Sequence, residues 1–189
     1  WLFVLEMPGS LPPGAILSHE YQVLSKTPVR SRIRYDLKSY PELVQGIDEA
    51  AASIDSHLRL PANNPRTRAL AGQWRRESGD GEAVVRRMLD HIRQERFFYT
   101  LTPPLLGENS IDQFLFETRR GFCEHFASAF VFAMRAAGVP ARVVTGYQGG
   151  ERNPVDGYWT VRQSDAHAWA EVWIEGRGWV RVDPTGAVA

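Results

Sequence analysis

Three residues of this sequence have the types and the order of a thiol acyl-transfer triad. Cys123 is the only cysteine among 189 residues, and it stands directly before an alanine-rich, helix-forming stretch. His167 and Asp183 follow it along the chain. A thiol nucleophile needs a base that takes its proton and an acid that orients the base. A cysteine, a histidine and an aspartate in this order therefore indicate nucleophilic acyl transfer.

The helix predicted after Cys123 gives the thiol a reason to ionise. The alanine-rich stretch runs to Ala137, and Gly138 with Pro140 beyond it supplies the C-terminal stop. Unpaired N–H groups and the positive end of the helix dipole stabilise negative charge at the first turn. The thiolate is therefore favoured, and the Cys123 N–H can serve an oxyanion. A lone cysteine is otherwise most often a small buried hydrophobic residue, so its surroundings decide.

The last two predicted strands each have one apolar face. Apolar side chains alternate with polar or aromatic ones in residues 167–174 and again in residues 178–182. If both apolar faces join one core, the loop between the strands must hold an odd number of residues. Glu175-Gly176-Arg177 is a natural loop of this kind, with a glycine available. We therefore expect an antiparallel hairpin across these three residues.

The register of this hairpin brings Asp183 to His167. Asp183 is placed opposite Trp169 and diagonal to His167, within reach of a side-chain contact. Asp183 can then hold the imidazole ring and leave its other nitrogen for Cys123. Asp165 is the alternative orienting acid, because it shares the strand face of His167, although it falls where the strand begins.

The other histidines are weaker candidates for chemistry. His125 lies two positions after Cys123, about 200° around a helix, and is expected to point away from the thiol. His19, His57 and His91 have no cysteine or paired acids at metal-ligand spacing, which favours surface or structural roles. The sequence also contains no phosphate-binding or dinucleotide motif. We therefore expect neither a metal nor a cofactor.

The composition excludes some partners and suggests a longer parent protein. The formal net charge is zero, so binding to nucleic acid through phosphate neutralisation is not expected. No apolar run approaches the ~20 residues that a membrane-spanning helix needs. The chain begins without a methionine and stops soon after Asp183-Pro184-Thr185. We therefore expect both ends to be cut from a longer chain.

The predicted elements favour an α+β fold, with helices first and an antiparallel sheet after them. Helices are expected over 42–57, 65–78, 81–94, 110–121 and 123–137, and strands over 16–25, 29–38, 97–101, 142–147, 158–163, 167–174 and 178–182. Two regions follow from this pattern. Residues 1–62 form an N-terminal flanking segment, partly β with a helix, and residues 63–189 form the catalytic core.

Several ordered blocks of sequence resemble the transglutaminase-like superfamily, a papain-related group of cysteine acyltransferases and hydrolases. The blocks are Gly121-Phe122-Cys123-Glu124, residues 135–147, His167-Ala168-Trp169, and Gly178-Trp179 through Asp183-Pro184-Thr185. The resemblance covers about residues 80–186. Residues 114–117 and 121–125 are similar to bacterial membrane-embedded members of the TgpA type, which carry a soluble extracytoplasmic catalytic domain between membrane helices.

The resemblance implies a papain-like core, with the nucleophile at a helix N-terminus packed on an antiparallel sheet. Cys123 would be the nucleophile, His167 the general base and acid, and Asp183 the orienting residue. Tyr99 lies where the family places an aromatic residue near the oxyanion, with simple packing as the alternative. Trp169 follows the His-x-Trp pattern of the family and is expected to line the active-site cleft. Acidic clusters like the calcium sites of animal transglutaminases are absent, so no metal is implied.

The implied reaction is acyl transfer through a thioester on Cys123, in the form of protein-glutamine transamidation. If water replaces the amine, the same triad gives an amidase or peptidase, and the sequence leaves this choice open. A non-catalytic scaffold or interaction domain with the same fold is the third alternative. The expected partner is a peptide or protein substrate of the cell envelope. The expected location is the periplasmic side of the inner membrane, in a membrane-anchored parent of undetermined oligomeric state.

Overall fold

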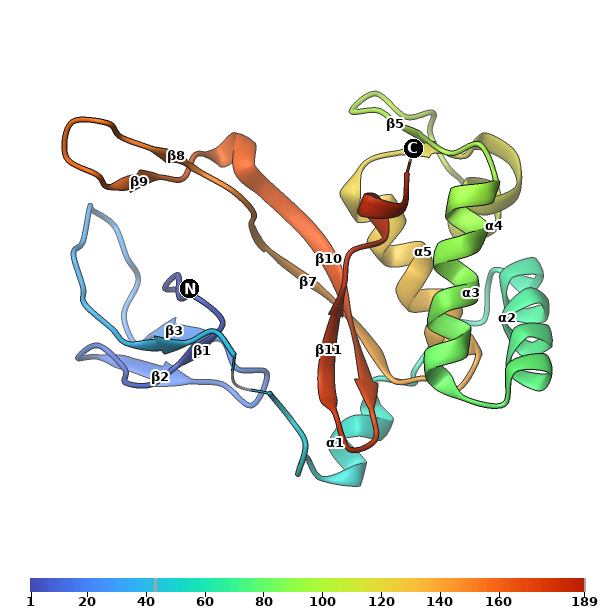
Figure 1. Cartoon of the computed structure of the whole chain (residues 1–189), viewed down its shortest axis with the longest axis horizontal. Coiled ribbons are helices and arrows are strands. Elements are labelled where there is room, and N and C mark those ends of the chain that lie inside the picture. The colour runs from blue at the N-terminus through green and yellow to red at the C-terminus, as the bar shows by residue number, and fades with distance from the viewer. Residues whose placement is uncertain (43, 189) are drawn as a thin grey trace. The chain divides into compact units, whose positions relative to one another are not determined.

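The computed structural model describes residues 1–42 and 44–188, and the chain divides into two units (Figure 1). The first unit is Trp1–Gln45 and the second is Gly46–Ala189. Residues 46–62 contact the rest of the second unit, because the His57 carbonyl accepts from the Ala141 N–H at 3.3 Å. The catalytic core predicted over residues 63–189 lies wholly within the second unit, and its own boundary at 62/63 stays a prediction.

The first unit consists of short antiparallel pairs. Strand β1 (Met7–Pro8) pairs with β4 (Ser39–Tyr40), and β2 (Ala15–Leu17) pairs with β3 (Val23–Ser25). The strand predicted over 29–38 is wrong: no regular strand forms there, and the apolar Val29 and Ile33 are each 47% exposed. Alternation predicts a strand only where another element covers the apolar face.

The second unit contains the predicted helices, with one large difference in length. The helices are α1 (Ala51–Ser56), α2 (Pro65–Ser78), α3 (Gly81–Gln94), α4 (Ser110–Gln113), the π-helical turn η1 (Phe114–Thr118) and α5 (Cys123–Ala136). Asp80 caps α3, since its side chain accepts from the Ala83 N–H at 2.7 Å. The helix predicted over 42–57 is much shorter: Leu43 lies outside the described residues, and only α1 is helical.

A three-stranded antiparallel sheet follows the helices. Its order is β11 (Gly178–Val182), β10 (Ala166–Ile174) and β7 (Ala141–Tyr147). Ala170 pairs with Val182 on one side and with Val143 on the other. The strands β5 (Phe98–Tyr99) and β6 (Arg120–Gly121) form a separate parallel pair, and β8 (Glu151–Arg152) and β9 (Trp159–Thr160) form a hairpin. Helices followed by an antiparallel sheet confirm the predicted α+β class.

Helix α5 fills the space between the helical layer and the sheet (Figure 1). On the sheet, Ala168, Ala170 and Val172 are at most 1% exposed, as the predicted alternation requires. On α5, Phe126 and Phe130 are fully buried, and each contributes about 1.5–3 kcal/mol by burial. Small residues next to these rings let α5 approach both neighbours closely.

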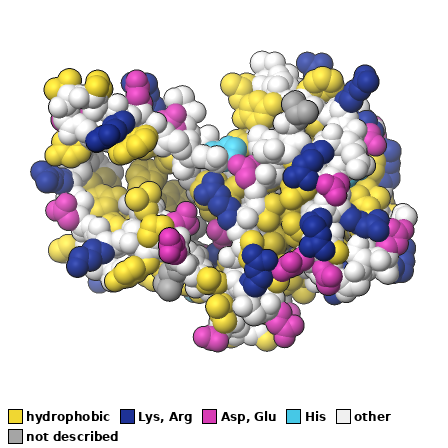
Figure 2. Space-filling model, viewed as in Figure 1, with side chains coloured by type: hydrophobic (Ala, Val, Ile, Leu, Met, Phe, Trp, Pro, Cys, Tyr) yellow, Lys and Arg dark blue, Asp and Glu magenta, His cyan; other side chains and the backbone are white. Residues whose placement is uncertain are grey.

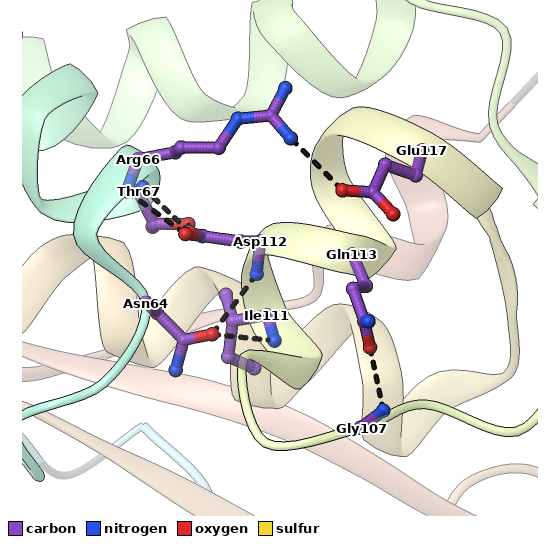
Figure 3. Close-up of polar contacts among 8 residues, drawn as sticks. All are labelled: Asn64, Arg66, Thr67, Gly107, Ile111, Asp112, Gln113 and Glu117. Carbon is purple, nitrogen blue, oxygen red and sulfur yellow. Dashed lines mark hydrogen bonds and ion pairs between the residues drawn. The ribbon is translucent and has the colours of Figure 1, made fainter.

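A polar clasp joins α2 to α4 and holds the segment that leads to Cys123 (Figure 3). The carboxylate of Asp112 accepts hydrogen bonds from the backbone N–H groups of Arg66 and Thr67, at 2.9 and 2.8 Å. In return, the Asn64 side-chain oxygen accepts from the N–H groups of Ile111 and Asp112, at 3.0 and 3.1 Å. Each helix therefore has its unpaired N-terminal donors satisfied by a side chain of the other.

The surface has no single-sign charge bias on the face that Figure 2 shows. Basic and acidic side chains are interspersed over the helical part, in keeping with a formal net charge of zero. Within the described ranges, no helix has both the length and the apolar character needed to cross a membrane.

Candidate active site

Cys123 is the first residue of α5 and packs against Ala168 of strand β10. It is 8% exposed and forms a small buried cluster with Ala127 and Ala168, against which Phe122 packs. Because Cys123 opens the helix, its backbone N–H has no acceptor within the helix. The N-terminal position predicted for the thiol is confirmed, and the helix dipole favours negative charge there.

His167 on β10 and Asp183, directly after the neighbouring strand β11, form a hydrogen-bonded pair. The Nε2 atom of His167 and the Oδ2 atom of Asp183 are 2.7 Å apart. The other carboxylate oxygen, Oδ1, accepts from the Thr185 N–H at 3.0 Å, which fixes the carboxylate plane. Since Asp183 occupies Nε2, the ring presents Nδ1 as its remaining nitrogen.

The hairpin register explains why this pair forms. Ile174 pairs with Gly178, which leaves the three-residue loop predicted from the apolar faces. The same register continues through Ala170 and Val182, so Asp183 follows directly opposite Trp169. The predicted diagonal contact between Asp183 and His167 is therefore present. Ala168, the neighbour of His167 on β10, belongs to the cluster of Cys123, so the backbone of β10 next to His167 lies beside the first turn of α5.

Tyr99 reaches Cys123 from a different part of the chain. Its strand β5 pairs with β6 directly before α5, and the Thr100 N–H donates to the Gly121 carbonyl at 2.8 Å. The Tyr99 ring stacks on Phe126 with centroids 6.5 Å apart and an interplanar angle of 8°. These contacts hold the ring beside the first turn of the helix.

The pKa of the Tyr99 hydroxyl is raised by its surroundings, which include Cys123. Partial burial raises the pKa of Tyr99, and the charge of the adjacent Cys123 thiol raises it further. The Cys123 side chain also raises this pKa, whereas the Cys123 backbone lowers it. Asp183 adds a smaller effect through its charge. Tyr99 therefore stays a protonated donor at neutral pH, next to the Cys123 N–H.

Trp169 is held between two other residues of the sheet. Its ring stacks on the His167 ring with centroids 6.3 Å apart, and the Arg181 guanidinium lies 4.1 Å above it. Gly146 passes beneath, where an added Cβ would come within 2.8 Å of the indole. Sequence reasoning placed Trp169 at the site but missed Gly146 and Arg181, although the glycine in a strand is a signal of close approach.

The two alternative residues have other partners. The Asp165 carboxylate accepts from the Arg162 N–H at 2.7 Å and so closes the turn before β10. His125 accepts from the Phe122 N–H through Nδ1 at 3.5 Å, and its ring lies against Phe122 and Phe114. Burial lowers the pKa of His125, which keeps its ring neutral at physiological pH. Among the described residues, no three histidine, cysteine or acidic side chains gather as a metal site.

Two curated proteins are similar to this chain in sequence. A protein of Pseudomonas aeruginosa named protein-glutamine gamma-glutamyltransferase is 43% identical over 190 residues, which cover 100% of this chain and 28% of that protein. An uncharacterized protein of Bacillus subtilis, YebA, is 37% identical over 139 residues, covering 69% of this chain and 19% of that protein. The chain thus spans less than a third of the length of either relative.

A solved structure shares the fold. The crystal structure of the periplasmic domain of TgpA from Pseudomonas aeruginosa, bound to ethylmercury, superimposes with a TM-score of 0.90 and 41% identity. The match covers 97% of this chain and 70% of that one. The family model of the transglutaminase-like superfamily matches residues 68–184, which contain Cys123, His167 and Asp183. This chain belongs to the transglutaminase-like superfamily.

Proposed function

We propose that this chain is the catalytic domain of a protein-glutamine γ-glutamyltransferase that works through a thioester on Cys123. The observation that carries the proposal is the His167–Asp183 pair, with its 2.7 Å contact, on the strand whose next residue, Ala168, packs in the cluster of Cys123. The name of the Pseudomonas relative supports transamidation as the reaction. The presence of all three triad residues favours an enzyme over a non-catalytic scaffold.

The first half of the reaction forms the thioester. The Cys123 thiolate attacks the carboxamide carbon of a glutamine side chain, and a C–S bond forms. The resulting oxyanion accepts from the Cys123 N–H and from the Tyr99 hydroxyl, whose pKa is affected by both the side chain and the backbone of Cys123. His167 protonates the departing nitrogen, which leaves as ammonia, and the carbonyl is restored.

The second half transfers the acyl group. A primary amine attacks the thioester carbon while His167 accepts the proton of the amine, and the C–S bond breaks to release the thiolate. Asp183 keeps the imidazole in one orientation and stabilises its protonated form. The product is a substituted amide. Water in place of the amine gives a carboxylate, which is the amidase or peptidase alternative.

The wider setting of the domain is also a proposal. We infer that the parent protein is anchored in the bacterial inner membrane, with this domain on the periplasmic side. The matching structure of the Pseudomonas protein is that of a periplasmic domain. The expected substrate is a protein or peptide of the cell envelope.

The test is a two-substrate assay. The domain is incubated with a labelled glutamine peptide and a labelled primary amine, and the products are separated by mass spectrometry. Amine incorporation that disappears in Cys123→Ala and persists in Ser56→Ala, an equally small truncation on α1, supports transfer. Deamidation or cleavage without amine incorporation supports hydrolysis instead. Equal turnover by the wild type and Cys123→Ala would remove Cys123 from the mechanism.

A further inference from the structure

Three tryptophans on one face of the sheet are held in different ways. Trp169 and Trp173 share this face because they are four residues apart on β10, and Trp179 pairs with Trp173. The indole N–H groups of Trp173 and Trp179 donate to a backbone carbonyl and to a carboxylate of the segment before α1, at 2.8 and 2.6 Å. The N–H of Trp169 is buried and has no acceptor among the residues that the structure describes. The orientation of Trp169 therefore depends on the groups that pack against its ring.

Arg181 reaches the Trp169 ring from the neighbouring strand β11. Its guanidinium carbon lies 4.1 Å from the centre of the ring, and a cation in this position is attracted to the indole. The same guanidinium donates to the Gln148 side-chain oxygen at 3.0 Å. Gln148 directly follows β7, which lies on the other side of β10. The Arg181 side chain therefore crosses β10 and is fixed at its far end, so that it holds Trp169 in place.

Gly146 limits the movement of the indole toward β7. A Cβ added at Gly146 would come within 2.8 Å of the Trp169 ring, so the strand backbone already approaches the ring closely. Gly146 is also the residue of β7 that pairs with His167. The ring of Trp169 is thus restrained by a guanidinium and by a strand backbone immediately beside His167.

The His167 imidazole depends on this ring for its tilt. The hydrogen bond to Asp183 restrains Nε2, which is one atom of the imidazole, and a single hydrogen bond tolerates some tilting. The second restraint is the Trp169 ring, which stacks on the imidazole at an interplanar angle of 25°. If the indole moves, the imidazole can tilt and shift Nδ1 while the bond to Asp183 is kept. Proton transfer is sensitive to a shift of this kind in the catalytic base.

We propose that Arg181 is a positioning residue, which clamps Trp169 and thereby fixes the plane of the His167 imidazole. Its effect on turnover rests on the proposed function, but the effect on ring geometry does not. Because the clamp acts on the base, its loss changes kcat more than KM. Lysine is a poor substitute, since it keeps the charge but lacks the planar group that can stack on the indole and donate to Gln148 at once.

The test compares Arg181→Met with Arg177→Met, a matched change in the loop of the same hairpin, where the guanidinium donates to Glu82. The two-substrate assay gives kcat and KM, and NMR follows the His167 ring protons, which are identified by their absence in His167→Ala. In Arg181→Met we expect kcat to fall roughly three- to tenfold with little change in KM, and the ring-proton shifts to move. Arg181→Lys should recover only part of kcat, and Arg177→Met should resemble the wild type.

A second variant approaches the same ring from the other side. Gly146→Ala pushes the indole without altering Arg181 and should move the same His167 shifts. The proposal is overturned if these shifts are unchanged in Arg181→Met, if its kcat falls no more than that of Arg177→Met, or if Arg181→Lys restores kcat fully, since charge alone would then suffice. If the wild type transfers no amine, the proposed function fails, and the His167 shifts alone decide whether the clamp exists.

Discussion

Asp112 in the α2–α4 clasp and Asp183 directly after β11 carry the same carboxylate group but have different kinds of hydrogen-bond partner. Asp112 is 3% exposed, and its oxygens accept from the Arg66 N–H, the Thr67 N–H and the Thr67 hydroxyl. Only one carboxylate oxygen of Asp183 accepts a hydrogen bond from a backbone N–H, that of Thr185. Its other oxygen faces the imidazole of His167.

The difference lies in what each partner can do. The partners of Asp112 are backbone and hydroxyl groups that do not change protonation in the physiological range, so the clasp can only hold two helices together. The partner of Asp183 is the imidazole of His167, a group that can accept and donate a proton during a reaction. We therefore expect damage to Asp112 to reduce stability, and damage to Asp183 to reduce turnover.

The largest effect is expected for Asp183→Asn. The amide keeps the shape of the side chain and can still accept from the Thr185 N–H, but its NH₂ group cannot accept from His167. The imidazole then loses its orientation, and kcat should fall on the order of 10²- to 10⁴-fold. Initial rates in the two-substrate assay and a thermal melt check this. A variant with near-normal turnover, or one that is simply unfolded, would contradict the assigned role.

Tyr99→Phe should have the next largest effect. The ring and its stacking on Phe126 remain, but the hydroxyl beside the Cys123 N–H is lost. Removal of one oxyanion donor should lower kcat by roughly 10²-fold with little change in KM. Tyr35→Phe, which removes a hydroxyl that donates to the Phe3 carbonyl, is the matched control. A loss of the same size in both variants would show that Tyr99 acts only by packing.

Asp112→Asn should act on stability alone. The amide replaces an acceptor oxygen by a donor group that faces backbone N–H donors, and the free energy of unfolding should fall by about 1–3 kcal/mol. Urea unfolding measures this change. The rate per folded molecule should stay near that of the wild type at a temperature where the variant is folded. A large loss of rate without a loss of stability would mean that the clasp takes part in the chemistry.

His91→Phe should give the smallest effect, visible only as a pH dependence. His91 lies against Trp74 and Phe97, and burial lowers its pKa from the ordinary 6.5. The unfolded chain therefore takes up a proton at higher pH than the folded one, so stability falls as pH drops below about 6.5. His91→Phe should make the decline between pH 7.5 and pH 5 shallower. An unchanged slope in chemical unfolding would show that His91 does not contribute to it.

The site was more predictable from sequence than the rest of the fold, for a physical reason. The register that joins Asp183 to His167 follows from two buried faces, because a slip of one residue would move every valine out of the core. The strand expected over 29–38 had the same alternation but nothing to cover Val29 and Ile33. The α2–α4 clasp depends on residues far apart in sequence, Asn64 and Asp112, that no local pattern pairs.

The contacts of Tyr99 and the cavity lined by Glu124 could not be predicted from local sequence patterns either. Tyr99 was placed near the site by family resemblance, but its contact with Cys123 depends on the parallel pairing of β5 with β6. The cavity beside the first turn of α5 is lined both by residues 103–106 and by residues 124, 125 and 128, which lie about 20 positions later in the sequence. Both arise from tertiary contacts that leave no periodic signal.

The central claim is that Cys123 is a nucleophile activated by the helix end and by the His167–Asp183 pair. The most direct measurement is the rate of Cys123 alkylation by iodoacetamide between pH 5 and pH 9, in the wild type and in His167→Ala. The account predicts rapid alkylation of the wild type at pH 6 and a loss of that low-pH reactivity in His167→Ala. Alkylation of the wild type only above pH ~8, as for an ordinary thiol, with no change in His167→Ala, would contradict it.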